Sequence, residues 1–359
     1  RKGSFTGATS DKNGLFQALV VGTPLHMHHP IVMEALNAGL DVFCEKCIAR
    51  TIDEAKEMVT ASISGNKVLQ VGHHLRYHPI YHIAKKKFID VQALGKINNI
   101  HCQWNRNGSW RRTPPPGTYD FGAWGYENPD ELFNWRLYKK FSGGLMTELA
   151  SHQLDVVNWV LNDPVPEAIN GVGRTDRDDG RTIFDNVHLI YEYPDNVQVT
   201  YQSITTNAYN PYGWEAYEMI QGDKGTLIMV HLAPKYIGLY FLEPDVPEAL
   251  WMPLASKADF DTGNLRRKEY KTAIVMGHPT GEDRISGLKL EALVTEDNLP
   301  KVSTYQLEMH DFRNSVLDRK KPFCDGMIGL KSAIPALRGN DAMEKQTRLE
   351  IAESDYTLG

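Results

Sequence analysis

The sequence has few cysteines, no long apolar run and no strong excess of charge. Only 4 of its 359 residues are cysteine, too few for a disulfide framework. No run of 18 apolar residues occurs, so we expect no membrane partner. The formal net charge is −6 with both signs interleaved, which argues against nucleic acid as a main partner. With no internal repeats, the length predicts an ordinary globular protein of two domains.

The cysteines and histidines do not predict a metal site. Cys44 and Cys47 form a C-x-x-C pair with no second pair nearby, and Cys44 belongs to a run typical of a buried strand. Neither zinc nor a redox pair is therefore favoured. The histidines of the first quarter of the chain lack the spacings that would bring three ligands together. They are His26, His28, His29, His73, His74, His78 and His82.

The first hundred residues alternate between short apolar runs and amphipathic stretches. The runs predict strands that are covered on both faces, and the stretches between them predict helices. Thr51 and Glu54 form a capping box at the start of the second helix. Together these elements predict a parallel, doubly wound sheet. The strands are expected at 16–22, 41–44 and 68–71, with helices at 30–38 and 51–63.

Polar residues follow each predicted strand at its carboxyl end. Thr23 and Pro24 follow the first strand, Glu45 and Lys46 the second, and a Gly-His-His run at 72–74 the third. Ligands of open α/β sheets bind at this edge. A lysine there can hydrogen-bond a substrate oxygen and stabilise a developing alkoxide. The alternative for Lys46 is a solvated loop lysine.

From residue 97 the pattern becomes that of an antiparallel sheet. A strand is predicted at 97–104, and turn signals at 194–196 and 222–225 separate the strands of two hairpins. Directly after the strand at 97–104 comes a long stretch, 105–134, that is rich in aromatic residues, proline and glycine. Its aromatic faces suit a sugar ring or a neighbouring subunit, and the sequence leaves both open. Two late helices are predicted at 305–319 and 330–344.

A helix that follows two glycines at 143–144 carries the most distinctive chemistry. Glu148, His152 and Asp155 recur at spacings of four and three, which places them on one helical face. A carboxylate one turn before a histidine suits proton transfer, because imidazole titrates near neutrality. The alternative is a structural helix start with Thr147 as its cap and a histidine in the core.

Seven short motifs follow one another along the chain. They are Thr23-Pro24 with His28, Glu45-Lys46, Arg76-Tyr77-x-Pro79, Trp135-Arg136, Glu148-x-x-x-His152-x-x-Asp155, Asp311-Phe312 and Asp325-Gly326. Each motif alone is weak, but their order and spacing are specific. Together they resemble the glucose–fructose oxidoreductase / inositol dehydrogenase / MocA (Gfo/Idh/MocA) family over nearly the whole chain. The resemblance implies a Rossmann-type domain followed by an open, mainly antiparallel α+β domain.

The resemblance implies domains at 1–96 (dinucleotide-binding, incomplete at its start) and 97–325 (substrate-binding and oligomerisation), with 326–359 packing back on the first. It also implies an NAD- or NADP-dependent oxidoreductase that acts on a sugar, glycoside or polyol hydroxyl. His152 would be the general base, Lys46 would stabilise the alkoxide, and Glu148 would orient or relay. Cofactor contacts would come from Thr23, Pro24, His28, Glu45, Lys46 and Arg136, and substrate contacts from Arg76, Tyr77, Trp110, Trp135 and Asp155.

Three departures from the family pattern stand out. The first strand and the glycine-rich loop are missing, and the glycines at 3 and 7 do not replace them, so we expect a further segment upstream of Arg1. The choice of NAD or NADP and any export signal would lie there; a cytoplasmic location is favoured, with a periplasmic one left open. Cys47 stands in place of proline, which makes a cis bond less expected. Glu148 replaces the commoner aspartate.

The aromatic stretch and the sequence around His152 resemble bacterial members that act on glycosides. Two alternatives to a dehydrogenase follow. One is an NAD-dependent redox glycosidase, which would couple oxidation, elimination and reduction. The other is a non-catalytic sugar- or nucleotide-binding subunit, which the missing glycine loop favours. The open second sheet also predicts a homo-oligomer, a dimer or tetramer.

Overall fold

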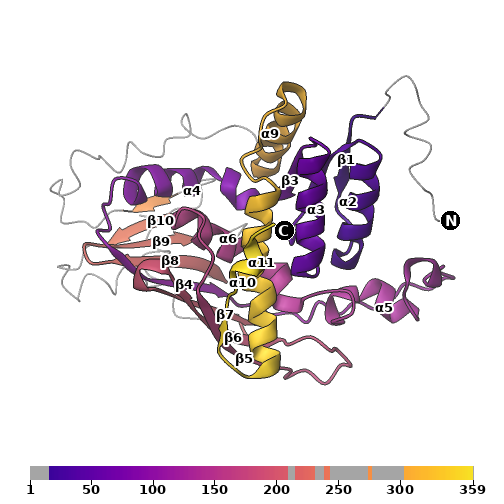
Figure 1. Ribbon diagram of the computed structural model, residues 1–359. Coiled ribbons are helices and arrows are strands. Elements are labelled where there is room, and N and C mark those ends of the chain that lie inside the picture. Colours follow the sequence, from indigo (N-terminus) through magenta and orange to yellow (C-terminus); the bar gives the residue numbers. More distant parts are fainter. Residues whose placement is uncertain (1–15, 209–214, 231–237, 243–273, 277–302, 359) are drawn as a thin grey trace.

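The computed structural model describes residues 16–208, 215–230, 238–242, 274–276 and 303–358. The glycines at 3 and 7 lie outside the described residues. Two sheets lie side by side, and a long helix, α10 (Gly326–Lys345), runs along their junction (Figure 1). This confirms the predicted pair of a Rossmann-like parallel sheet and an open, mainly antiparallel sheet.

The first sheet consists of three parallel strands in the order β1-β2-β3 among the described residues. Apolar side chains of β2 and β3 are buried on both faces, as their sequences predict. The predicted capping box at the start of α3 is present, with Thr51 and Glu54 bonding each other's backbone N–H. The elements are β1 (Ala18–Val21), α2 (His28–Asn37), β2 (Asp41–Glu45), α3 (Ile52–Ser64) and β3 (Leu69–Gly72).

Short helical turns precede α2 and follow β3. The 3-10 turn η1 (Leu25–Met27) leads into α2, so helical structure begins a few residues before the predicted start. After β3 come the 3-10 turn η2 (His74–Tyr77) and α4 (Pro79–Ala84), which has Pro79 in its first turn. A π-helical turn, η3 (Lys85–Ile89), completes this helix.

The second sheet has the order β11-β10-β9-β8-β4-β7-β6-β5-β12 within the described residues. Both predicted hairpins are present, β6–β7 and β8–β9. Among the described strands of this sheet, only the pairs β4–β7 and β10–β11 are parallel. The strands are β4 (Ile97–Trp104), β5 (Ala168–Arg174), β6 (Asn186–Tyr193), β7 (Val197–Ile204), β8 (Ala216–Gly222), β9 (Thr226–Val230), β10 (Gly238–Leu242), β11 (Ile274–Met276) and β12 (Leu349–Glu350).

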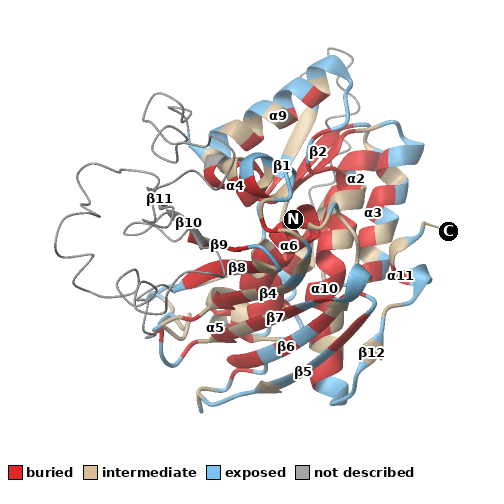
Figure 2. Cartoon of the chain, turned by 90° about the vertical axis from the view of Figure 1, so that its left-hand side faces the viewer, coloured by how far each residue is buried: buried red, intermediate tan, exposed pale blue. Residues whose placement is uncertain are grey.

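Helices cover one face of the second sheet, and α10 contacts both sheets. A Cβ added at Gly329 would lie 2.3 Å from Val71 of β3, and one added at Gly339 would lie 2.8 Å from Leu189 of β6. These two glycines therefore let one helix pack closely on both sheets. Along the strands of the second sheet, residues that face the helices are buried, and many of the residues between them point to the opposite face and are exposed (Figure 2). The remaining helices include α5 (Pro129–Phe133), α6 (Ser151–Val160), α9 (Thr304–Asp318) and α11 (Glu353–Tyr356).

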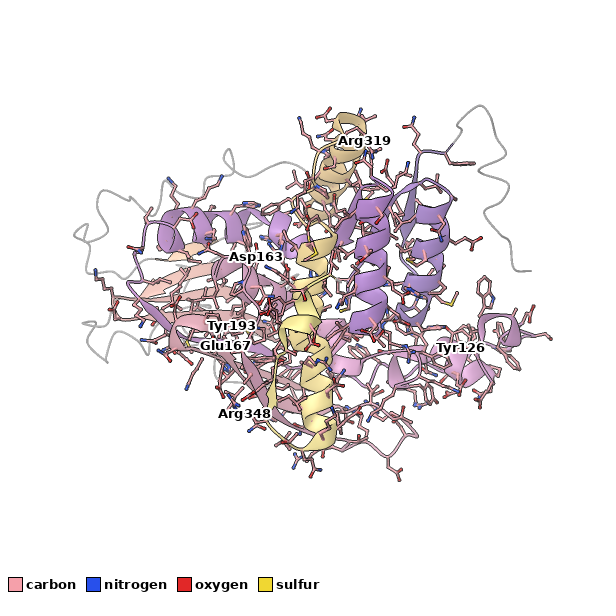
Figure 3. The ribbon with its side chains drawn as sticks, viewed as in Figure 1. Tyr126, Asp163, Glu167, Tyr193, Arg319 and Arg348 are labelled. Carbon is pink, nitrogen blue, oxygen red and sulfur yellow. The ribbon has the colours of Figure 1, made fainter. Side chains whose placement is uncertain are left out.

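A buried ion pair joins the two halves beside α10. Arg76 of η2 donates from Nε to Oδ1 of Asp155 on α6 at 2.9 Å, and both side chains are fully buried. Ser332 of α10 donates its hydroxyl to the same carboxylate. Arg76 also donates to Asp163, which lies beside α10 at the junction (Figure 3). Three elements from different parts of the chain thus meet on one carboxylate.

Replacing Arg76 with alanine should strongly destabilise the fold, because Asp155 would remain buried without its cation. We expect a loss of about 3–5 kcal/mol in the free energy of unfolding, measured by urea denaturation. Arg348→Ala is the matched control. Its ion pair with Glu192 has side chains 46% and 45% exposed, so its loss should cost under about 1 kcal/mol. Equal losses in the two variants would contradict this role for the buried pair.

Candidate active site

Lys46 reaches from the end of β2 across the junction to the second domain. Its Nζ donates to the carbonyl oxygens of Thr147 at 3.2 Å and Glu148 at 3.1 Å. Both carbonyls belong to the π-helical turn η6 (Met146–Ala150), which leads directly into α6. The ammonium therefore lies against the helical turn that precedes His152. The Lys46–Cys47 peptide bond is cis, so the expectation that cysteine in place of proline disfavours a cis bond was wrong.

Glu148 and His152 lie in different surroundings. The carboxylate of Glu148 accepts a hydrogen bond from Nε of Arg136 at 2.9 Å, and its side chain is 12% exposed. His152 meets the ring of His74 edge-on at 4.9 Å and that of Trp104 at 5.8 Å. The imidazole thus lies between an aromatic residue of the second sheet and the loop after β3.

The three loops at the carboxyl ends of β1, β2 and β3 meet as predicted. The backbone N–H of Lys46 donates to the carboxylate of Glu45 at 3.2 Å. That carboxylate lies against Gly72 at the end of β3, where an added Cβ would be 3.0 Å from its Oε2. Burial is the main cause that raises the pKa of Glu45, and Lys46 opposes it. Gly72 thereby gives Glu45 room. The crevice is the place where these strand-end loops meet the turn η6.

His28 was predicted to contact the cofactor, but its ring is used inside the fold. It is only 2% exposed. Its Nε2 lies 2.9 Å from the carbonyl oxygen of Thr23, and its Nδ1 lies 2.9 Å from that of Cys47. Both ring nitrogens therefore face the backbone of the crevice loops, and we correct the expectation of a direct cofactor contact.

Three residues predicted to contact substrate are also buried in the interior. Arg76 and Asp155 bond each other, as described above. The Tyr77 hydroxyl donates to Asp311 at 2.7 Å and accepts from Gln70. The hydrogen bonds of these polar groups are thus made inside the protein. We therefore correct their assignment as substrate contacts: they hold the two domains and α9 together. Polar residues just past a strand end can face inward as well as outward, and the sequence does not distinguish these directions.

The two predicted tryptophans are partly exposed and both lie near arginines. Arg136 stacks on Trp135 at 4.3 Å and also bonds Glu148, so this pair belongs to the crevice. Trp110 instead contacts Arg106 at 5.3 Å. It is part of the aromatic stretch 105–134, which carries α5 beneath α2 and α3, with Tyr126 near its outer end (Figure 3).

Two buried titratable groups lie close to the residues of this site, and sequence reasoning missed one of them, Glu308. Glu308 of α9 is 1% exposed, and its Oε1 has no hydrogen-bond partner in the described part of the chain. Burial, and then the negative charge of Glu45, raises the pKa of Glu308 to about 9. His73 is equally buried, and burial lowers its pKa to about 4. The run at 72–74 indicated His73, whereas a single glutamate in an amphipathic helix gives no signal.

The fold and the crevice define a class of protein: a Rossmann-type domain whose strand ends face an open α+β sheet, with a lysine and a histidine brought to the boundary. Residues 8–73 match the oxidoreductase family with an NAD-binding Rossmann fold, and residues 82–228 match the GFO/IDH/MocA C-terminal domain. The chain belongs to the Gfo/Idh/MocA oxidoreductase family.

Individual relatives agree with this assignment. A levoglucosan dehydrogenase from Pseudarthrobacter phenanthrenivorans is 29% identical over 45% of this chain and 39% of its own. A 1,5-anhydro-D-fructose reductase from Ensifer adhaerens is 27% identical over 76% of this chain and 74% of its own. The solved aldose-aldose oxidoreductase from Caulobacter crescentus has the same fold, with a TM-score of 0.67 and 17% identity over 97% of this chain and 82% of its own.

The chain spans about half the length of several curated relatives that it matches. None of the described helices combines the length and apolar character that crossing a membrane requires.

Glu308→Gln should remove a pH-dependent part of the stability. Glu308 keeps its proton in the folded state up to about pH 9, whereas in the unfolded chain it loses the proton near its ordinary pKa. The folded state therefore binds more protons between these values, and stability falls as pH rises by at most about 1.4 kcal/mol per unit.

The measurement is the free energy of unfolding at pH 5, 7 and 8.5. Glu308→Gln should show a shallower decline than the wild type, and Glu353→Gln, at an exposed position, should follow the wild type. An unchanged slope in Glu308→Gln would contradict a neutral buried carboxyl.

Proposed function

We propose that the protein transfers a hydride between a hydroxyl-bearing carbon of a sugar, glycoside or polyol and the nicotinamide of NAD or NADP. The observation that carries the proposal is the contact of the Lys46 ammonium with the carbonyl oxygens of Thr147 and Glu148. It brings a cation from the Rossmann half to the turn that precedes His152. A hydroxyl placed there would have a cation and an imidazole close by.

The residues at the strand ends fit the nicotinamide end of such a cofactor. The partly exposed Glu45, the last residue of β2, offers a carboxylate acceptor, and Lys46, which follows it, offers a donor. Both lie at the edge where ligands of parallel sheets bind. When bound, the cofactor supplies the hydride acceptor in the oxidation direction. Arg136 pairs with Glu148 and its side chain is 40% exposed, so its charge suits a phosphate or ribose oxygen.

The proposed chemistry follows from three residues. His152 takes the proton of the hydroxyl group while the carbon gives up its hydride, so that the alcohol becomes a carbonyl. The Lys46 ammonium stabilises the negative charge that develops on the oxygen. Glu148 orients the oxygen or relays the proton, and Arg136 holds its carboxylate at 2.9 Å. In the reduction direction His152 returns the proton.

A cyclic carbohydrate is the favoured substrate class. Two of the three relatives described above are named for anhydrosugars, which are rings with several hydroxyl groups. Partly exposed aromatic side chains, Trp104 next to His152 and Trp135 next to Arg136, provide faces on which such a ring can lie. Apolar ring faces and a few directed hydrogen bonds are what small-molecule sites combine.

Substitutions at Lys46 and His152 should strongly lower turnover without unfolding the protein. We expect His152→Asn to lower kcat/KM about a hundred- to ten-thousandfold. Lys46→Met should lower it about a hundred- to a thousandfold. The assay follows absorbance at 340 nm with NAD⁺ or NADP⁺ and a panel of anhydrosugars, glucosides and inositols.

Lys87→Met, at an exposed position of the π-turn after α4, is the control and should keep wild-type activity. Wild-type protein with no activity on any sugar, or full activity in His152→Asn, would overturn the proposal.

We also propose that the outer face of the second sheet pairs two copies of the chain. Val172 is 66% and Ile190 50% exposed on this face. They border a hollow of about 450 Å³ that His101, His188 and Thr200 also line. Exposed apolar residues on an open sheet face favour self-association.

Val172→Lys should shift the protein toward the monomer in analytical ultracentrifugation, because pairing would bury an ammonium at the interface. Val91→Lys is the control, at a valine that is 60% exposed and lies after α4. Identical sedimentation of both variants and the wild type would contradict this face as the interface.

A further inference from the structure

His28 lies between the two loops that carry the proposed cofactor site. It is the first residue of α2 and is almost fully buried. One ring nitrogen lies 2.9 Å from the carbonyl oxygen of Thr23, in the loop after β1. The other lies 2.9 Å from the carbonyl oxygen of Cys47, the residue that follows Lys46. A single ring thus spans both loops.

The number of donors decides what this ring can do. Backbone carbonyl oxygens only accept hydrogen bonds. A neutral imidazole has one N–H, so it can donate to Thr23 or to Cys47 but not to both. An imidazolium has two N–H groups and can donate to both. At 2.9 Å, a ring nitrogen without a proton would face a carbonyl oxygen lone pair to lone pair. The geometry at both nitrogens is therefore that of the protonated ring.

Some charged and titratable groups around the ring raise the pKa of His28, and others lower it. Lys46, from the β2 loop, opposes a positive charge on His28, and Glu148, from the turn η6, favours it. His26, from η1, interacts with it as a second titratable ring. Burial is the largest influence and lowers the pKa of His28, while the two carbonyl oxygens raise it. Protonation therefore takes place on the acid side of the ordinary histidine range.

We propose that His28 is a positioning residue for Lys46: its protonated ring ties the Thr23 loop to the Lys46–Cys47 loop, and its neutral ring holds only one of the two. The link to catalysis rests on the proposed function. Because Cys47 is covalently next to Lys46, releasing its carbonyl oxygen frees the backbone that aims the ammonium at Thr147 and Glu148. Cofactor binding at these loops is accordingly tighter with the protonated ring.

The first test observes the ring directly and does not depend on activity. Protein labelled with ¹⁵N-histidine is titrated from pH 8 to pH 5 by NMR, with His28→Gln used to assign the His28 signals. We expect one protonated ring nitrogen at high pH and two at low pH. The backbone amide of Ile48 should shift over the same pH range. A His28 ring that keeps one unprotonated nitrogen at every pH at which the protein is folded would overturn the proposal.

The second test measures the dissociation constant of NAD⁺ at pH 5.5 and pH 7.5. In the wild type we expect binding about tenfold tighter at the lower pH, the size of one charge-assisted hydrogen bond. A glutamine side chain can donate from only one nitrogen, so His28→Gln should show no such change. His29→Gln is the matched control. His29 contacts Glu57 at 2.8 Å on the surface, and this variant should keep the wild-type change.

The two tests separate the possible failures. Wild-type pH dependence in His28→Gln would overturn the positioning role, because that variant lacks the second donor at every pH. If the wild type binds neither NAD⁺ nor NADP⁺ at any pH while both ring nitrogens of His28 become protonated, the loop contact stands and the proposed redox function falls. A merely structural His28 would lower the stability of His28→Gln and leave the pH dependence of binding unchanged, which would also overturn the proposal.

Discussion

The contact between the Lys46 ammonium and the turn η6 is the interaction on which the crevice depends. A lysine on a short loop can reach carbonyl oxygens about a hundred residues away in sequence only if the two domains are held in one relative position. The buried pair of Arg76 and Asp155 and the close packing of α10 on both sheets supply that constraint. The turn itself is π-helical, and such turns are found frequently at functional sites.

Much of the fold could be predicted because local signals and long-range packing agree. Apolar runs before Thr23 and Lys46 indicated parallel strands, and Thr51 with Glu54 fixed a helix start. The direction of polar side chains could not be predicted. Arg76 sits near a strand end, where ligand contacts and buried ion pairs have the same local sequence; only the position of Asp155 in space decides between them.

The same limit explains the corrections within the candidate site. His28 lies where a cofactor contact is expected, but two backbone carbonyl oxygens, which no sequence pattern encodes, occupy its ring nitrogens. No sequence motif indicated Glu308. Its raised pKa results from burial and from the charge of Glu45, which only the three-dimensional structure reveals. The site thus combines two cations, Lys46 and Arg136, with the partly exposed Glu45 and the buried Glu308. A developing negative charge on a substrate oxygen fits the cations, and a protonated Glu308 adds no negative charge to that of Glu45.

The origin of the transferred hydrogen tests this account most directly. Full-length protein is incubated with NAD⁺ and sugars deuterated at every ring carbon, and the reduced cofactor is analysed by mass spectrometry. We expect one deuterium in the nicotinamide ring, since the hydride comes straight from the hydroxyl-bearing carbon of the sugar. Reduced cofactor that contains only hydrogen from the solvent, or no reduced cofactor with any sugar, would contradict direct hydride transfer in this crevice.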